Sequence, residues 1–210
     1  MSSLALALQN TPIGSLGPKR TERQHFVYYD SLFFLSMQFG GNAKTMLEVG
    51  CANDPFSQYL TWIPSKTCVA PYRVQYSPNR NPADTEDNQT QKSGQAQHQQ
   101  QFSREVDFVK ADFMKFQEPP EKYDLLICSQ VVEHVDDPGG FVKKLIEAAR
   151  TSIISVPYQW NDKNCKACHH KSNYITLEMI ANWAAPYKHD HHFIVQDNNA
   201  KRVILVFHHE

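Results

Sequence analysis

The stretch Met46-Leu47-Glu48-Val49-Gly50-Cys51-Ala52-Asn53-Asp54-Pro55 decides the fold of this chain. A short apolar run ends on an acid and a glycine, and the following Phe56–Leu60 segment is able to start a helix. A strand, a glycine turn and a helix in this order bring backbone N–H groups and a helix N-terminus to one point, which suits a nucleotide-like ligand. The glycine spacing is looser than the dinucleotide-binding fingerprint, so the rest of the chain must specify the ligand.

Length and charge indicate one globular domain. With 210 residues, the chain is long enough for one substantial core and short for two. Its 21 basic and 22 acidic residues nearly cancel, which argues against a chain that coats nucleic acid or acidic membranes. No apolar run approaches the roughly 20 residues of a membrane helix, and the Leu4–Leu8 run is too short for a secretory signal. We therefore expect a cytoplasmic protein without a membrane partner.

Strand and helix patterns alternate along the chain. A loose tail is predicted at 1–20, a single domain at 21–210, and a low-complexity insertion at about 79–104 that is too polar to bury a core. Strands are predicted at Met46–Val49, Thr67–Ala70, Val106–Lys110, Tyr123–Cys128 and Ser152–Val156, helices at Glu22–Phe39, Pro138–Arg150 and Thr176–Ala184, and a closing antiparallel pair at Phe193–Gln196 and Arg202–Phe207. This α/β alternation predicts a mostly parallel sheet with helices on both faces, whose ligands bind beyond the carboxyl ends of the strands.

Three motifs in order give the chain a family resemblance. Leu47–Cys51, then Val109–Phe113, then Tyr123–Val135 resemble class I S-adenosylmethionine-dependent methyltransferases, and the Glu133–Pro138 run is similar to their small-molecule branch. The resemblance covers roughly residues 44–160. It implies a Rossmann-like three-layer sandwich with a seven-stranded sheet and an antiparallel C-terminal strand. It also implies methyl transfer from S-adenosyl-L-methionine to an oxygen or nitrogen of a small-molecule acceptor.

The same resemblance implies a cofactor site. The first turn would hold the amino-acid end of S-adenosylmethionine, the second motif its adenine, and the end of the fourth predicted strand would lie beside the sulfonium. The implied residues are Glu48, Gly50, Cys51, Ala52, Asp54, Asp112, Phe113, Ser129 and Gln130. Two structural alternatives remain open: Asp112 caps a turn, and Glu48 pairs with a buried donor.

Two positions depart from the family pattern. Ala52 stands where a second glycine is usual, and Ala70 stands where an acid normally binds the ribose hydroxyls. Compensating groups would have to come from Tyr72, Asn79 or the acids Asp84, Glu86 and Asp87, or Arg73 would mark a phosphate-bearing nucleotide. These departures favour a second hypothesis, a degenerate member that binds a ligand or partner without turnover.

Cysteine and histidine cluster near the end of the predicted domain. The five cysteines are odd in number and follow no export signal, which argues against a disulfide framework. Cys165, Cys168 and nearby histidines allow a zinc site and hence a metal-binding interaction module, but a plain loop with free thiols fits better, so no metal site is assigned. In the resembled family this loop borders the acceptor, so we expect His169 or His170 to remove a proton during methyl transfer. His134, on the segment after the fourth predicted strand, is a second candidate, and helix packing beside the cofactor site is its structural alternative.

The aromatic first helix has two further interpretations. Tyr28 and Tyr29 would close over the cofactor as N-terminal helices do in the resembled family, although core packing is expected for at least one of them. Its aromatic face would also suit a homodimer.

Overall fold

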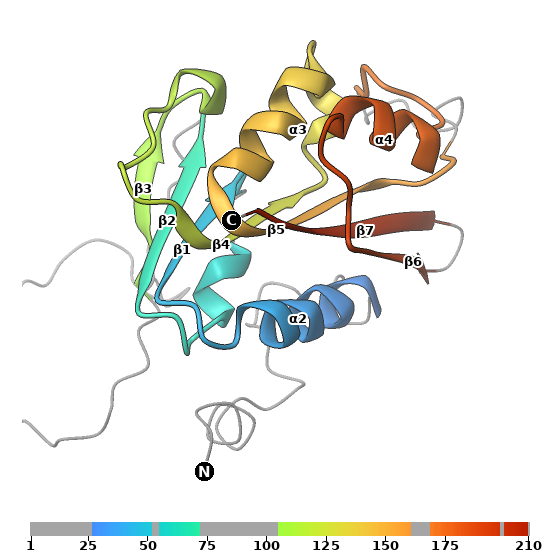
Figure 1. Cartoon of the computed structure of the whole chain (residues 1–210). Coiled ribbons are helices and arrows are strands. Elements are labelled where there is room, and N and C mark those ends of the chain that lie inside the picture. Colours follow the sequence, from blue (N-terminus) through green and yellow to red (C-terminus); the bar gives the residue numbers. More distant parts are fainter. Residues whose placement is uncertain (1–26, 52–54, 72–104, 161–168, 198–199, 210) are drawn as a thin grey trace, which may run out of the picture.

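The computed structural model describes residues 27–51, 55–71, 105–160, 169–197 and 200–209. These residues form one seven-stranded sheet with the order β3-β2-β1-β4-β5-β7-β6 (Figure 1). The strands are β1 (Thr45–Val49), β2 (Ser65–Ala70), β3 (Asp107–Lys110), β4 (Tyr123–Ser129), β5 (Ala149–Pro157), β6 (His191–Asp197) and β7 (Ala200–His208). All neighbours are parallel except β7, which runs antiparallel to β5 and β6. The predicted Rossmann-like sheet with its antiparallel C-terminal strand is confirmed.

Helices cover both faces of the sheet. On one face lie α3 (Pro138–Glu147) and α4 (Leu177–Ala184), and on the other lie α2 (Val27–Gly40) and the 3-10 turn η1 (Phe56–Tyr59) (Figure 1). Two further 3-10 turns, η2 (Phe113–Lys115) and η3 (Val132–His134), follow β3 and β4. The predicted tail at 1–20 and the insertion at 79–104 lie outside the described residues.

Alternation along the strands divides the interior into two cores. Successive side chains of a strand point to opposite faces. Leu47 and Leu126 therefore pack with α3 and α4, whereas Met46 and Leu125 pack with α2 and η1. All four of these side chains have no exposed surface. Burial on both faces explains why β1 and β4 carry adjacent apolar residues, Met46 and Leu47 in β1 and Leu125–Cys128 in β4, in place of a strict alternation.

The first predicted helix after the glycine turn is shorter than its sequence suggests. Phe56–Tyr59 makes only one 3-10 turn, in which the Leu60 N–H bonds to the Ser57 carbonyl at 3.1 Å. The chain turns again at Leu60, whose carbonyl accepts from the Ile63 N–H, and then enters β2. The short distance to β2 leaves no room for a longer helix.

The helix predicted to run to Arg150 ends three residues earlier, at Glu147. Ala149 lies opposite Tyr123 of β4, and Arg150 also belongs to β5. These two residues fit the helical spacing but pair in the sheet. This is a case of tertiary pairing overriding local propensity.

The outer surface of α2 carries apolar side chains next to β6. Val27 and Phe34 are more than half exposed, and Phe193 and Ile194 of β6 are also exposed. The homodimer expected from this aromatic face stays a prediction. Within the described residues, no helix is long and apolar enough to span a membrane.

Asp124 ties together the starts of β1 and β4. Its Oδ2 accepts hydrogen bonds from the N–H groups of Lys44 and Thr45, at 2.8 and 3.0 Å, and from the Thr45 hydroxyl at 3.2 Å. Burial alone raises the pKa of Asp124, but these bonds and the nearby Arg150 outweigh it, so the pKa is lower than its ordinary value. The charged form of Asp124 therefore stabilises the fold.

We expect Asp124→Asn to lower the free energy of unfolding by about 1–2 kcal/mol at pH 7. A depressed native pKa supplies stability above the pKa of the unfolded chain and loses it as pH falls through the native pKa. The difference between wild type and variant should therefore shrink below about pH 4. Urea unfolding at pH 7 and pH 3 measures both values, with the exposed Asp107→Asn as control. An equal difference at the two pH values would contradict this role.

Candidate functional site

The turn after β1 requires a glycine at its first position. Gly50 has φ +80, a left-handed conformation that side chains disfavour. A Cβ on Gly50 would lie 2.2 Å from Cγ2 of Val131, which follows β4. The Gly50 N–H also donates to the Val69 carbonyl at 2.9 Å. The start of the turn therefore packs between the end of β2 and the segment that follows β4.

Glu48 holds the far side of the same turn. Its carboxylate is 6% exposed, and its two oxygens accept from the N–H groups of Phe56 and Ser57 at 2.9 and 2.7 Å. This arrangement is the structural alternative in which Glu48 pairs with buried donors. The two hydrogen bonds fix the start of η1. A contact between Glu48 and a cofactor stays a prediction, and Ala52 and Asp54 lie outside the described residues.

Cys51 is joined to Cys68 of β2 by a disulfide, with Cα atoms 6.1 Å apart. The odd cysteine count argued against a disulfide framework and did not predict this single pair. The cause is the sheet: β1 and β2 are parallel neighbours with Glu48 opposite Cys68, so the turn that leaves β1 passes beside Cys68. Cys128 of β4 is a buried free thiol. Its pKa is raised mainly by burial, and the negative charges of Glu133 and Glu48 raise it further.

The second motif forms a capped turn after β3. Oδ1 of the exposed Asp112 accepts from the Met114 N–H at 2.9 Å and so caps η2, as the structural alternative expected. Phe113 is buried, with its ring centroid 5.4 Å from that of Phe141 in an edge-to-face arrangement. The Lys144 ammonium lies 5.0 Å from the centre of the Phe113 ring. The predicted adenine contacts of Asp112 and Phe113 stay predictions.

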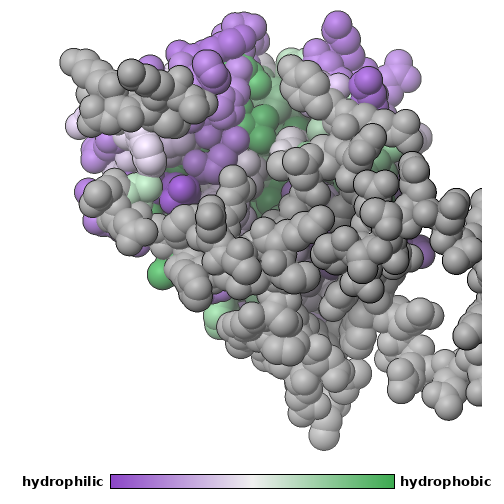
Figure 2. Space-filling view, turned by 180° about the vertical axis from the view of Figure 1, so that it is seen from behind, coloured by the Kyte–Doolittle hydropathy of each residue, from purple (hydrophilic) through white to green (hydrophobic). Residues whose placement is uncertain are grey.

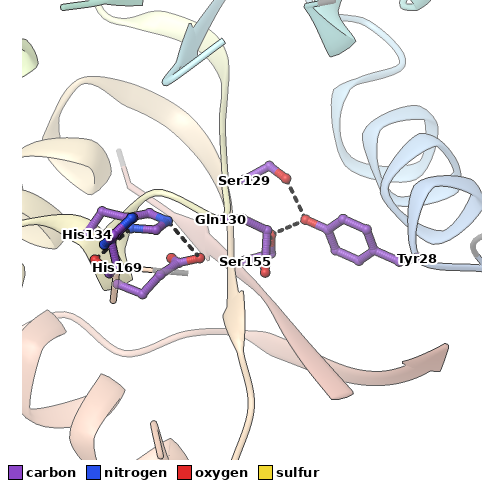
Figure 3. Close-up of polar contacts among 7 residues, drawn as sticks. Tyr28, Ser129, Gln130, His134, Ser155 and His169 are labelled. Atoms are coloured by element: carbon purple, nitrogen blue, oxygen red, sulfur yellow. Dashed lines mark hydrogen bonds and ion pairs between the residues drawn. The ribbon is translucent and has the colours of Figure 1, made fainter. Parts of the chain in front are cut away.

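At the ends of β4 and β5, two serine hydroxyls meet a tyrosine from α2. The Tyr28 hydroxyl is hydrogen-bonded to Ser129 and Ser155 (Figure 3). Tyr28 is 2% exposed, and burial is the main cause that raises its pKa. Tyr28 is thus a core residue, whereas Tyr29 is half-buried against it, with ring centroids 5.1 Å apart.

Gln130 follows directly in a left-handed conformation, with φ 57. Its N–H donates to the Ser155 carbonyl at 3.0 Å, and its side-chain Nε2 lies 3.5 Å from the Ser155 hydroxyl. Ser129 and Gln130 are both half-buried at the carboxyl edge of the sheet. The contact between Ser155 and Tyr28 could not be predicted, because the two residues are 127 positions apart in the sequence.

The three predicted histidines come together beyond the end of β4. His134 closes η3, and its Nδ1 lies 3.4 Å from the His169 carbonyl (Figure 3). The rings of His134 and His170 are 4.8 Å apart between centroids. Beside them is Glu133, which is 1% exposed and which the sequence analysis did not single out. Its only sequence signal is its place in the Glu133–Pro138 run.

Ala70 occupies the end of β2, where an acid was expected. It is 7% exposed, and its carbonyl accepts from the Ala111 N–H at 3.0 Å. The groups proposed to compensate for the missing acid all lie between residues 72 and 87, outside the described residues. In the space-filling view, hydrophobic side chains are visible in a hollow between two hydrophilic surfaces (Figure 2).

Several solved structures with the same fold are named as methyltransferases. The N-methyltransferase NodS from Bradyrhizobium japonicum, in complex with S-adenosyl-L-homocysteine, is 12% identical, with a TM-score of 0.63 over 99% of this chain and 98% of that one. A 1,6-didemethyltoxoflavin-N1-methyltransferase from Burkholderia thailandensis is 13% identical, with a TM-score of 0.62 over 97% of this chain and 88% of that one. Magnesium protoporphyrin IX methyltransferase from Synechocystis is 12% identical, with a TM-score of 0.58 over 100% of this chain and 98% of that one. At these identities the likeness shows the fold.

The seven-stranded sheet with its antiparallel β7 is the fold of class I methyltransferases. Residues 22–196 match the methyltransferase domain family, so the chain belongs to that family. A search of curated protein sequences found no match. The resemblance inferred from the three motifs is confirmed.

We expect Gly50→Ala to lower the free energy of unfolding by about 2–4 kcal/mol, because it adds backbone strain and an overlap with Val131. The double variant Gly50→Ala/Val131→Ala removes the overlap but keeps the strain. It should be less destabilised than the sum of the two single variants by about 1 kcal/mol or more. Chemical unfolding of the four proteins measures this coupling, and strictly additive effects would show that Val131 does not restrict Gly50.

We expect Tyr28→Phe to destabilise the fold by about 1–2 kcal/mol, because it leaves Ser129 and Ser155 without their phenol partner. Tyr174→Phe is the matched control, since the Tyr174 side chain is 56% exposed and should stay within about 0.5 kcal/mol of wild type. Thermal unfolding of both variants compares them directly. Equal stabilities would exclude the hydrogen bonds of Tyr28 as a link between α2 and the sheet.

Proposed function

We propose that this methyltransferase domain transfers a methyl group from S-adenosyl-L-methionine to an oxygen or nitrogen of a small molecule. The observation that carries the proposal is the glycine turn, because Gly50 in its left-handed conformation and the Glu48 carboxylate that binds the start of η1 both lie at the carboxyl edge of the sheet. Ligands of such sheets bind at this edge. Two of the structural neighbours described above are named as N-methyltransferases, and the names of two give didemethyltoxoflavin and magnesium protoporphyrin IX as acceptors, which supports the acceptor class.

The reaction needs positioning and one proton acceptor. The lone pair of the acceptor atom attacks the methyl carbon, the carbon–sulfur bond breaks, and its electrons return to sulfur, leaving neutral S-adenosylhomocysteine. The proton of the acceptor atom must then leave, and an imidazole suits this step because its pKa lies near neutrality. His134 and His169 are exposed and His170 is half-buried at the end of β4, so all three are proposed as the proton acceptor.

Ala70 favours a second candidate, a member of the family that binds a ligand or partner without turnover. A hydrogen bond to a charged acceptor contributes about 1.5–3 kcal/mol. Its loss weakens cofactor binding by about ten- to a hundredfold unless another group compensates. The buried alanine at the end of β2 is the one described feature that opposes methyl transfer.

Calorimetry with S-adenosylmethionine and S-adenosylhomocysteine separates the two candidates. We expect saturable micromolar binding of both, and weaker binding by Gly50→Ala under conditions where that variant remains folded. No binding at high micromolar ligand would contradict the enzymatic function. Incubation with methyl-labelled cofactor and a metabolite extract would then identify the acceptor.

We expect Ala70→Asp to tighten binding of S-adenosylhomocysteine by about tenfold or more, since it restores a charged acceptor for the ribose hydroxyls. Ala70→Asn is the matched control, because it has nearly the same shape without the charge. Titration calorimetry measures both, after thermal unfolding has confirmed that each variant is folded. Weaker binding by the aspartate variant than by the asparagine variant would contradict the assignment of this position.

A further inference from the structure

Glu133, His134 and His170 place three metal-ligating groups at one point. One carboxylate oxygen and one nitrogen from each imidazole all lie within 4.8 Å of one another. In the part of the chain that the structure describes, no other set of three such side chains meets this spacing. The carboxylate is buried while His134 is exposed, so the cluster reaches from the interior to the surface.

Backbone hydrogen bonds preassemble this cluster from two segments far apart in sequence. The N–H groups of Lys171 and Ser172 donate to the Glu133 carbonyl at 2.8 and 3.1 Å. The Lys171 ammonium also forms an ion pair with Asp136, two residues beyond His134. The loop that carries His170 is therefore tied to η3 by contacts that do not use the ligand atoms.

The ring of His134 has an orientation that suits a ligand. Its Nδ1 lies 3.4 Å from the His169 carbonyl, and because a carbonyl can only accept, a hydrogen bond here requires the tautomer with the proton on Nδ1. The lone pair then belongs to Nε2, which lies 3.9 Å from Oε1 of Glu133. Metal-binding histidines commonly hold their other ring N–H on a carbonyl in this way.

We propose that Glu133, His134 and His170 form a binding site for a divalent transition-metal ion of the zinc type. One carboxylate oxygen and two imidazole nitrogens are a ligand set of zinc and related ions, with at least one coordination position left open. With bonds of about 2.1 Å, tetrahedral ligand atoms stand about 3.4 Å apart. Small side-chain rotations would bring the observed spacing to this value.

This site differs from the zinc set that the sequence allowed. That set used Cys165 and Cys168, which lie outside the described residues, whereas this one uses a buried carboxylate and the histidine beside it. His134 belongs to the new set alone, so it distinguishes the two. Metal binding also has a consequence for the proposed chemistry: bound His134 and His170 cannot accept a proton, which leaves His169 for that step.

Zinc titration of the metal-free full-length protein tests the proposal without any methyl-transfer assay. We expect one zinc equivalent to bind with micromolar or tighter affinity, both in wild type and in the Cys165→Ser/Cys168→Ser variant. His134→Ala and His170→Ala should each weaken binding by at least tenfold in that cysteine-free background. Co²⁺ in place of Zn²⁺ supplies a visible absorption band that reports a nitrogen and oxygen ligand set.

His189→Ala/His192→Ala is the matched control, because these imidazoles approach to 3.2 Å and lie outside the proposed cluster. Its zinc affinity should equal that of wild type. Glu133→Gln should also weaken zinc binding. If this buried substitution prevents folding, the zinc affinity of the exposed His134→Ala variant decides between the outcomes. The proposal is overturned if zinc does not bind, if binding survives His134→Ala, or if it disappears with the two cysteines.

Discussion

The buried carboxylate of Glu48 is the interaction on which the carboxyl edge of the sheet depends. Taking an ionised group out of water costs several kcal/mol even after relaxation, and the two backbone N–H groups that donate to the Glu48 oxygens offset part of this cost. Hydrogen bonds to a charged acceptor contribute about 1.5–3 kcal/mol each. They also join the end of the strand β1 to the first residues of η1.

The second restraint on this edge comes from the segment that follows the neighbouring strand β4. Val131 occupies the space that any side chain at position 50 would need, so the segment after β4 and the turn after β1 define each other's shape. Gln130 enters that segment in a left-handed conformation, and its N–H is held by β5. The turn after β1 is therefore in direct contact with the segment after β4, and η3 with His134 follows directly in that segment.

Local sequence was sufficient for most of the fold. Apolar runs predicted every described strand, and the helix predicted at Thr176–Ala184 is α4, with Thr176 as its cap, whose hydroxyl accepts from the Met179 N–H. The errors came where pairing between distant segments overrode local pattern. Ala149 and Arg150 fit a helical spacing, but the neighbouring β4 takes them into the sheet.

The candidate site was less accessible to sequence reasoning. The motifs identified the turn and the histidines, but the partners that give these residues their roles are distant in sequence. Tyr28 meets Ser155 across 127 positions, and the loop after His170 is tied to the carbonyl of Glu133. Glu48 and Asp112 show a different limit. Each is an acid within a motif, yet its carboxylate accepts hydrogen bonds from backbone N–H groups close by in the sequence.

The contact of Tyr28 with the ends of β4 and β5 has a practical consequence. Because Tyr28 stands at the beginning of α2, the described chain starts beside the edge that carries the proposed site (Figure 1). The last strand runs the other way, and His208 ends opposite Thr151 near the start of β5. An affinity tag or fluorescent label joined after β7 would therefore project from the edge remote from the site. The same label placed immediately before α2 would crowd it.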